Sequence, residues 1–517
     1  MEKDRKNEDI LEKRKKNIKN KFNKLISNKY DKLAFLVIIL SAIFRFYWLF
    51  KTKTQALWFD EGTYLVQARA WALGTPAYPE PARDYFISFI WSIFIKLGFG
   101  ELGLRILTVT LGILSLLFFY YIVSYFFNKK AGLFSMILAS VFYEAIFWSL
   151  RLDIGTYSIF FMLISLFFFV KGMDTKKLKF YLLASAFAVF SLLSHAAGIF
   201  IILFYIIFIP INSKFKFYKN KKFYIILLCF FLVISPFLIR NIIVTGKIYP
   251  RYQIGWVERG GTSGSFLEAM KYIKTLPQII GLPSFLIFLI GLFLSLDIFL
   301  ILDRLWKNYS KETQGKLFFL IFGLISLSLG IQSLLFNKGG AYFEPRYIIP
   351  FYLACFAFAG IGLNFIFNKI KKYNKFIAII FVILLLGYIS YIQLNKSSDL
   401  IELKTQGYQG IKQAGLWLNQ NSNPGDKIVS FETPQIIYYS NRQGLAIPRE
   451  NEEVRQLIIN EKAKYLLVWA GFGMERINDL LAFIEKNNQS IIPRQGFPAN
   501  SQPTTVIYEI KDYSLIL

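Results

Sequence analysis

The chain has 517 residues, of which 55% are hydrophobic and 18% are aromatic, whereas only 18% are charged. A soluble domain usually carries about a quarter charged residues, so the composition excludes a soluble enzyme, a disordered chain and a disulfide-stabilised scaffold. The formal net charge of +27 does not indicate nucleic-acid binding, because the lysines cluster between long apolar runs, as in the cytoplasmic loops of membrane proteins. The sequence therefore predicts an all-α polytopic membrane bundle.

Residues 1–32 precede the first apolar run and form a Lys-rich polar segment. The segment is too long and too polar for the start of a cleaved signal peptide, so we expect a basic cytoplasmic tail that lies against anionic lipid. About eleven membrane spans are expected within residues 33–393, since a span needs roughly 17–25 residues. They are predicted near residues 33–50, 104–127, 131–149, 155–171, 179–195, 197–211, 223–239, 282–302, 317–336, 347–367 and 376–393.

Residues 85–97 form one further apolar helix, which is short for a span. If this helix does not cross, the basic loops of the bundle fall on the cytoplasmic side with the tail; if it crosses, they fall outside, against the positive-inside rule. We therefore expect it to lie at the outer interface, within a first outer loop of residues 51–103, and we expect the C-terminus outside. The basic loops are residues 128–130, 171–179, 214–222, 303–316 and 369–375.

Residues 394–517 are less hydrophobic and are predicted to form a small extracytoplasmic α/β domain. Short runs typical of strands alternate there with helical stretches and with turn signals such as Asn423-Pro424-Gly425. No catalytic motif is recognisable in this domain, so we expect a structural or acceptor-docking role. The predicted strands are Lys427–Phe431, Gln435–Tyr439, Lys464–Trp469 and Thr504–Ile510.

Ionisable side chains gather at the outer ends of the predicted spans and in the outer loops. Carboxylates are too short to reach the headgroups from within the membrane, so acids at span ends indicate a wet cavity open to the outer leaflet. A carboxylate can accept a proton from an alcohol, and arginines can hold a phosphate as it leaves. This combination fits glycosyl transfer from a lipid-linked sugar phosphate, and the sequence has no Walker A or dinucleotide-binding motif. The residues concerned are Asp60, Glu61, Glu80, Arg83, Arg105, Arg151, Asp153, His195, Arg240, Glu344 and Arg346.

Short motifs occur in a fixed order between residues 33 and 370. They are Asp60-Glu61 followed by Tyr64 and an Ala-rich helix ending at Gly74, Arg105 at the start of a span, Arg151-Leu152-Asp153 after the next, Pro236 with Arg240-Asn241, and Pro345-Arg346-Tyr347 with Pro350. In this order they resemble the polytopic glycosyltransferases of the C superfamily, in the branch that contains the protein O-mannosyltransferases and the bacterial aminoarabinose transferases of lipid A.

The resemblance implies a polyprenyl-phosphate-linked sugar as donor, an inverting mechanism, and an extracytoplasmic acceptor that is a lipid, a protein or a glycan. By motif match, Asp60 is expected to be the general base or its close partner, and Glu61 and Asp153 the other acids of the site. Arg83 stands where the aminoarabinose transferases carry a phosphate-binding lysine after a metal-contacting glutamate, a position that Glu80 takes here. The residues expected to bind the donor phosphate are Arg83, Arg240, Arg346 and Arg105.

Alternatives remain at this point. A transporter or flippase for a lipid-linked saccharide would also have many spans and a polar outer cavity, although the sequence has no clear internal repeat. A non-catalytic assembly protein with an external docking domain is a second alternative. His195 is either a hydrogen-bonded helix-end residue or a ligand or proton relay. The sequence requires no cofactor, and Glu80 and His195 are the candidate ligands if a divalent metal binds.

Overall fold

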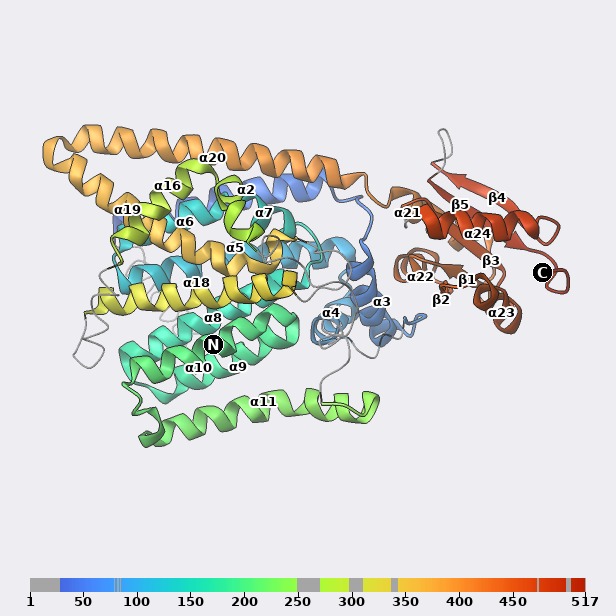
Figure 1. The fold of residues 1–517 in the computed structure, drawn as a ribbon, viewed down its shortest axis with the longest axis horizontal. Helices are drawn as coiled ribbons and strands as arrows, with labels where there is room; N and C mark the ends of the chain where they lie inside the picture. The colour runs from blue at the N-terminus through green and yellow to red at the C-terminus, as the bar shows by residue number, and fades with distance from the viewer. Residues whose placement is uncertain are drawn as a thin grey trace, which may run out of the picture. The chain divides into compact units, whose positions relative to one another are not determined.

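The computed structural model describes residues 28–78, 80, 83, 85–248, 270–296, 310–335, 343–471, 474–498 and 504–516. Figure 1 shows that most of the chain is helical, and the described residues belong to two compact units. The helical unit comprises residues 1–48, 108–150 and 154–397, and the mixed unit comprises residues 49–107, 151–153 and 398–517. The predicted basic tail lies outside the described residues up to position 27.

Long apolar helices dominate the helical unit. Among the described residues, seven helices are long and apolar enough to cross a membrane, and a bent pair provides an eighth candidate. The pair is α6 (Lys129–Ser140) with α7 (Tyr143–Ser149), bent by 62°. The seven are α2 (Lys29–Lys51), α5 (Glu101–Phe126), α8 (Ile154–Thr175), α11 (Lys221–Thr245), α18 (Lys311–Leu335), α19 (Ile349–Tyr373) with its leading turn η4 (Pro345–Ile348), and α20 (Lys375–Thr405).

Shorter apolar helices occupy the other predicted spans. They are α9 (Leu178–Ser194), α10 (Ile199–Asn212) and α16 (Leu282–Phe293). Each of the eleven predicted spans thus coincides with an apolar helix or with the bent pair, which confirms the predicted fold class. The predicted span 282–302 extends into residues 297–309, which lie outside the described residues. Connecting turns and short helices are η1 (Ala196–Gly198), η2 (Phe217–Lys219), α14 (Lys271–Lys274) and α15 (Leu276–Ile280).

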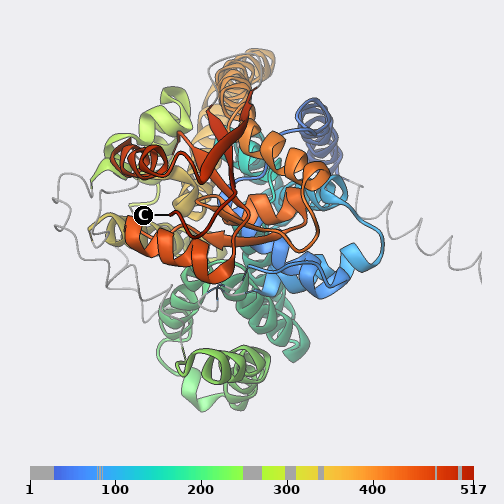
Figure 2. The same cartoon turned by 90° about the vertical axis from the view of Figure 1, so that its right-hand side faces the viewer.

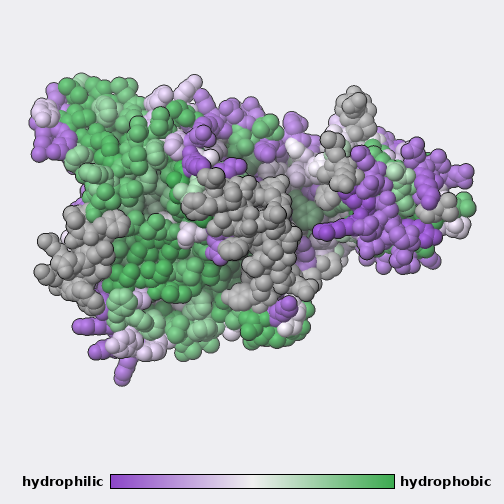
Figure 3. Space-filling view, in the orientation of Figure 1, coloured by the Kyte–Doolittle hydropathy of each residue, from purple (hydrophilic) through white to green (hydrophobic). Residues whose placement is uncertain are grey.

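Aromatic rings and close backbone contacts hold the helical unit together. Phe204 of α10 meets Phe318 of α18 edge to face, with the ring centroids 4.7 Å apart. Helices α16 and α19 lie so close that a Cβ atom on Gly291 would sit 1.8 Å from the Phe358 carbonyl oxygen. Small residues permit this approach between membrane helices. Many large apolar side chains on these helices are exposed, and the face seen in Figure 3 is largely apolar where it is coloured, which suits a lipid environment.

A five-stranded sheet forms the centre of the C-terminal residues, in the order β2-β1-β3-β5-β4. Strand β1 pairs in parallel with β2 and β3, whereas β5 pairs antiparallel with β3 and β4. Alternate residues point to opposite faces, so Ile428 and Leu467 pack against one pair of helices while Val429 and Leu466 pack against the other. Figure 2 shows helices on both sides of the sheet. The strands are β1 (Lys427–Ser430), β2 (Gln443–Ala446), β3 (Tyr465–Trp469), β4 (Ile491–Phe497) and β5 (Thr505–Ile510).

Two helices cover each face of this sheet. Helices α21 (Gln409–Asn421) and α22 (Thr433–Ser440) pack on one face, and α23 (Asn451–Glu461) and α24 (Met474–Lys486) pack on the other. The predicted strand Gln435–Tyr439 was wrong, because this segment is helix α22. Its β-branched and aromatic residues favour a strand, but Pro434 at the first turn and Asn441 in the left-handed conformation after the last turn delimit a helix.

The first loop packs against the C-terminal residues within the mixed unit. It contains helices α3 (Phe59–Leu73) and α4 (Phe86–Lys96), and α3 lies against α22. The Leu57 N–H donates to the Tyr439 hydroxyl at 2.8 Å, and Arg69 donates to the Tyr438 carbonyl oxygen at 2.8 Å. The first loop and the C-terminal residues therefore belong to the same compact unit.

Helix α4 is amphipathic and has 11 residues. At about 1.5 Å per residue, a helix of this length is much shorter than the roughly 30 Å of a bilayer core. Trp91 is buried on its inner face, while Phe89 and Ile93 are exposed on the other. These features agree with the predicted interfacial helix, whose membrane position stays a prediction.

Candidate active site

The acidic pair Asp60-Glu61 lies in the first turn of α3, where the N-terminus of a helix favours negative charge. Trp58 precedes the helix with an extended backbone, and its N–H donates to Glu61 Oε2 at 2.7 Å. A carboxylate at this position of the first turn commonly caps the helix start. The local sequence thus directs Glu61 back toward the chain and leaves its neighbour Asp60 on the exposed side.

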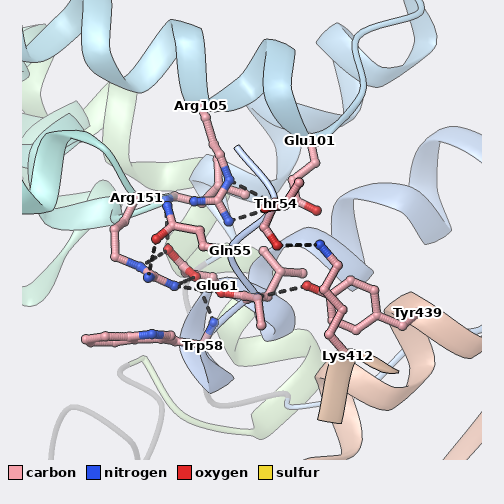
Figure 4. A network of polar contacts seen from close by, with 12 residues as sticks. Thr54, Gln55, Trp58, Glu61, Glu101, Arg105, Arg151, Lys412 and Tyr439 are labelled. Carbon is pink, nitrogen blue, oxygen red and sulfur yellow. Dashed lines mark hydrogen bonds and ion pairs between the residues drawn. The ribbon is translucent and has the colours of Figure 1, made fainter. Parts of the chain in front are cut away.

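Glu61 forms a buried ion pair with Arg151 (Figure 4). Arg151 Nε donates to Oε1 at 2.8 Å and Arg151 Nη2 donates to Oε2 at 2.6 Å, while the Leu152 N–H donates to Oε1 at 2.9 Å. With the Trp58 N–H, the carboxylate accepts four hydrogen bonds, and Glu61 is only 5% exposed. A carboxylate so fully occupied is suited to hold segments together rather than to accept a proton.

Arg151 is as fully engaged as its partner. Its Nη1 donates to Gln55 Oε1 at 2.9 Å and its Nη2 donates to the Ala56 carbonyl oxygen at 3.0 Å. The guanidinium also lies over the Trp58 ring, 4.3 Å from its centroid, as a cation–π contact. These contacts fasten the segment 151–153 to the start of the first loop.

The electrostatics of Glu61 follow from this geometry. Burial by itself raises the pKa of the Glu61 carboxyl, but the positive charges of Arg151 and Arg105 and the hydrogen bonds from Arg151 and Trp58 outweigh it, so the pKa lies below its ordinary value of 4.5. Glu61 is therefore ionised at neutral pH.

Arg105 is fully buried at the start of α5. Its Nε and Nη2 donate to Glu101 Oε1 at 3.0 and 2.8 Å, as Figure 4 shows. Lys412 of α21 and Tyr439 of α22 approach the same network, with Lys412 Nζ donating to the Thr54 carbonyl oxygen at 2.8 Å. Contact between Arg105 and a donor phosphate stays a prediction, and its burial favours a structural role instead.

Asp60 lies in a different environment from Glu61. Its side chain is 54% exposed, and Arg83 Nη1 donates to Oδ1 at 3.0 Å. Arg83 is itself only 4% exposed, and its Nε donates to Glu80. Its guanidinium also lies over the Tyr64 ring, 5.4 Å from the centroid. Arg83 thus bridges two carboxylates and orients Asp60 while leaving this side chain accessible.

The motif Arg151-Leu152-Asp153 lies next to the motif Asp60-Glu61 in the structure. The Leu152 N–H bonds to Glu61, and Asp153 follows Leu152 directly and is partly buried. Asp60 and Asp153 therefore belong to segments that are joined through the Glu61–Arg151 pair. Their catalytic roles stay predictions.

The other predicted residues lie in the helical unit. Arg346 pairs with Glu344 at 3.1 Å, and its guanidinium lies over the Trp148 ring at 4.1 Å. Arg240, at the end of α11, donates to Asn241 Oδ1 at 3.1 Å. These contacts leave the predicted phosphate-binding roles of Arg346 and Arg240 open.

His195 connects two helices at a chain reversal. It ends α9, and its Nδ1 accepts a hydrogen bond from the Ala197 N–H at 3.0 Å. Its ring stacks on Tyr347, with the centroids 6.2 Å apart. This capping contact favours the helix-end role over metal ligation. Among the residues that the structure describes, no three His, Cys, Asp or Glu side chains are placed to hold a metal ion.

The sequence analysis named Arg151 among the ionisable residues of the outer cavity but gave it no role, and it did not single out Gln55 or Glu432. Glu432 is nevertheless close enough to Asp60 for their charges to interact. A signal for Arg151 was present, because a buried arginine at the outer end of a span needs an acidic partner. No local pattern marks Gln55 or Glu432, whose positions depend on the fold.

Part of the sequence matches a known protein family. The sequence model of the dolichyl-phosphate-mannose-protein mannosyltransferase family matches residues 78–239. Comparison with curated protein sequences gave no match. The matched segment contains Arg83, Arg105, Arg151 and Asp153, and it ends one residue before Arg240.

Solved structures of similar fold cover almost the whole chain. The structure of ArnT from Cupriavidus metallidurans bound to undecaprenyl phosphate matches with a TM-score of 0.63 and 11% identity, over 92% of this chain and 97% of that chain. The oligosaccharyltransferase of Archaeoglobus fulgidus in the apo form matches with a TM-score of 0.60 and 12% identity, over 86% of this chain and 70% of that chain. An Archaeoglobus fulgidus AglB complex with an inhibitory peptide and a dolichol-phosphate matches with a TM-score of 0.55 and 12% identity, over 85% of this chain and 70% of that chain. The chain therefore has the fold of these membrane proteins, and the family model matches the part of the chain that carries several of the predicted motifs.

Proposed function

We propose that this protein is an integral-membrane inverting glycosyltransferase, which moves a sugar from a polyprenyl-phosphate donor to an extracytoplasmic acceptor. The observation that carries the proposal is the contrast within Asp60-Glu61. Glu61 is buried and accepts four hydrogen bonds, whereas Asp60 is 54% exposed and is oriented by a hydrogen bond from Arg83. An accessible, oriented carboxylate on a rigid support is what a general base requires.

In the proposed reaction, Asp60 accepts the proton of the acceptor hydroxyl. The acceptor oxygen forms a bond to the anomeric carbon on the face opposite the phosphate, and the bond from that carbon to the phosphate oxygen breaks. Polyprenyl phosphate leaves with the bonding electron pair. Arginine side chains compensate its charge, with Arg346 and Arg240 as the first candidates.

The comparisons support a lipid-phosphate donor. The ArnT structure is described as bound to undecaprenyl phosphate, and the AglB complex as containing a dolichol-phosphate and a peptide. The lipid tail of such a donor accounts for an enzyme embedded in the membrane. The exposed apolar side chains on the face of the helical unit seen in Figure 3 suit a membrane environment.

The release of polyprenyl phosphate tests the function. Purified full-length protein in liposomes receives polyprenyl-phosphate mannose labelled in the sugar, together with a panel of lipid, peptide and glycan acceptors. A transferase releases polyprenyl phosphate and moves the label to an acceptor with inverted anomeric configuration. A flippase moves the labelled lipid across the bilayer without cleaving it, and an assembly protein does neither. The proposal would be rejected if the protein gave either of these two outcomes with every acceptor in the panel, both with polyprenyl-phosphate mannose and with other lipid-linked sugars.

We also propose that the protein resides in the cell membrane, with the first loop and the C-terminal residues on the extracytoplasmic side. Lys53 and Lys372 are both exposed lysines, the first in the outer loop and the second at the end of α19 in a predicted cytoplasmic loop. A membrane-impermeant maleimide should label Lys53→Cys in intact cells and Lys372→Cys only after permeabilisation. The reverse pattern would place Asp60 on the cytoplasmic side and end the proposal.

A further inference from the structure

A buried glutamate of the C-terminal residues lies beside the candidate base. Glu432 precedes α22 and is only 5% exposed. Gln435 Nε2 donates to Glu432 Oε2 at 2.8 Å, and the backbone N–H of Glu432 donates to Ser430 Oγ at 3.1 Å. The structure therefore fixes this carboxyl group in place, although the reaction described above does not use it.

Helix α22 is pressed against α3, the helix that carries Asp60. A Cβ atom on Gly62 would lie 3.2 Å from the Gln435 backbone nitrogen and 3.3 Å from Pro434. Because Gly62 and Gln435 are close neighbours in sequence of Asp60 and Glu432, this contact brings the two carboxyl groups into one region of the mixed unit. The Gln435 Oε1 atom is buried there without a hydrogen-bond partner among the described residues.

The charged groups of this region are unbalanced. Asp60 faces Glu432 from α3, and the segment that follows α3 contributes Tyr78, Glu80 and Arg83. Among the described residues, these three carboxyl groups and one guanidinium would carry a net charge of −2 if all were ionised, which opposes the approach of an anionic phosphodiester. A neutral Glu432 lowers that charge to −1.

We propose, on the basis of the function proposed above, that Glu432 is a positioning residue of the Asp60 site, which admits the anionic donor while its carboxyl group is neutral and weakens donor binding when it ionises. Two further observations agree with a neutral carboxyl near pH 7. Burial, together with the negative charge of Asp60 and against the Gln435 hydrogen bond, raises the pKa of Glu432 from 4.5 to about 7. A protonated Glu432 is also a donor for the unpartnered Gln435 Oε1, after rotation of the amide.

The size of the effect follows from the neutral fraction. For a group with a pKa of about 7, roughly nine tenths is neutral at pH 6 and roughly a tenth at pH 8. If only the neutral form binds the donor well, the apparent dissociation constant rises by roughly tenfold over this interval. Burial raises the pKa of Tyr78 above its ordinary value of 10, so this residue does not titrate in the same window.

The dissociation constant of polyprenyl-phosphate mannose, followed by the intrinsic fluorescence of the full-length protein between pH 6 and 8.5, tests this role. The phosphodiester keeps its charge over this range. The wild-type constant should rise by roughly tenfold between pH 6 and pH 8, whereas Glu432→Gln should bind at pH 8 as tightly as the wild type does at pH 6. Glu453→Gln, an exposed glutamate on α23, is the matched control and should keep the wild-type profile.

Parallel profiles for the wild type and Glu432→Gln would overturn the inference, as would weaker binding by Glu432→Gln at pH 8. If Glu432→Gln does not fold, the wild-type profile decides alone, because a constant that does not change with pH contradicts the proposal. Failure of the wild-type protein to bind polyprenyl-phosphate mannose or any of the other lipid-linked sugars at any pH counts against the proposed function itself. Binding without pH dependence removes only the role of Glu432.

Discussion

Asp60 and Glu61 are adjacent in the sequence, yet their surroundings differ in every respect that matters for chemistry. Glu61 belongs to a buried pair with Arg151, in which all the hydrogen bonds stay within the protein. Asp60 belongs to a half-open pair with Arg83, in which one carboxylate face is left to solvent. The comparison teaches that one helix turn can carry two different acids: the buried one joins segments of the chain, and the exposed one is the proposed base.

The largest effect on stability is expected from breaking the buried pair. Glu61→Gln leaves Arg151 charged and buried without a counter-charge, so the free energy of unfolding should fall by about 3–5 kcal/mol. Thermal unfolding in detergent measures this loss. Asp60→Asn is the matched control on the neighbouring residue and should lose no more than about 1 kcal/mol, because its pair is half exposed. Equal unfolding temperatures for the two variants would contradict the comparison.

The buried pair should also produce an acid-side pH dependence of stability. The pKa of Glu61 is lower in the folded protein than its ordinary value of 4.5, so its stabilisation is fully present above pH 4.5 and is lost as the pH falls through the folded value. Unfolding measured in a pH series should show a steeper decline below pH 4.5 for the wild type than for Glu61→Gln. Identical slopes would mean that Glu61 is not held by positive charge.

A smaller effect is expected where α3 meets α22. Gly62→Ala introduces a Cβ atom 3.2 Å from the Gln435 backbone nitrogen, so we expect a loss of about 1–3 kcal/mol from overpacking. Gly387→Ala, inside α20 with no atom within 4 Å of the new Cβ, should be neutral or slightly stabilising. If Gly62→Ala is as stable as Gly387→Ala, the two helices do not pack as closely as described.

The smallest effect concerns the hydroxyl that joins the first loop to α22. Tyr439→Phe removes the acceptor of the Leu57 N–H and leaves a buried donor unpaired, at a cost of about 1–3 kcal/mol, and we expect the lower end. Tyr513→Phe removes an exposed hydroxyl that bonds to the Lys462 carbonyl oxygen and should have almost no effect. Denaturant unfolding of both variants compares them, and equal midpoints would remove this link between the loop and α22.

Much of the fold could be predicted from the sequence, because apolar runs long enough to span a bilayer leave few alternatives to a helix. The segment Gln435–Tyr439 shows the limit, since its residues favour a strand while Pro434 and Asn441 delimit a helix. The acidic pair was recognisable from its motif, but the sequence did not indicate that Glu61 would be buried and Asp60 exposed. The burial of Glu61 depends on its ion pair with Arg151, which is 90 positions away in the sequence and contacts Glu61 only in the folded chain.

The rate of glycosyl transfer by Asp60→Asn is the most direct test of the central claim, that Asp60 is the base and Glu61 its support. Single-turnover transfer from polyprenyl-phosphate mannose, or from the lipid-linked sugar that the release assay identifies, should fall by about 10²–10⁴-fold, the contribution of a positioned base. The unfolding temperature should stay close to that of the wild type, and donor binding should not weaken, because the substitution removes a negative charge from the region that receives the anionic donor. A purified Asp60→Asn protein that keeps more than about a tenth of the wild-type rate would contradict the account.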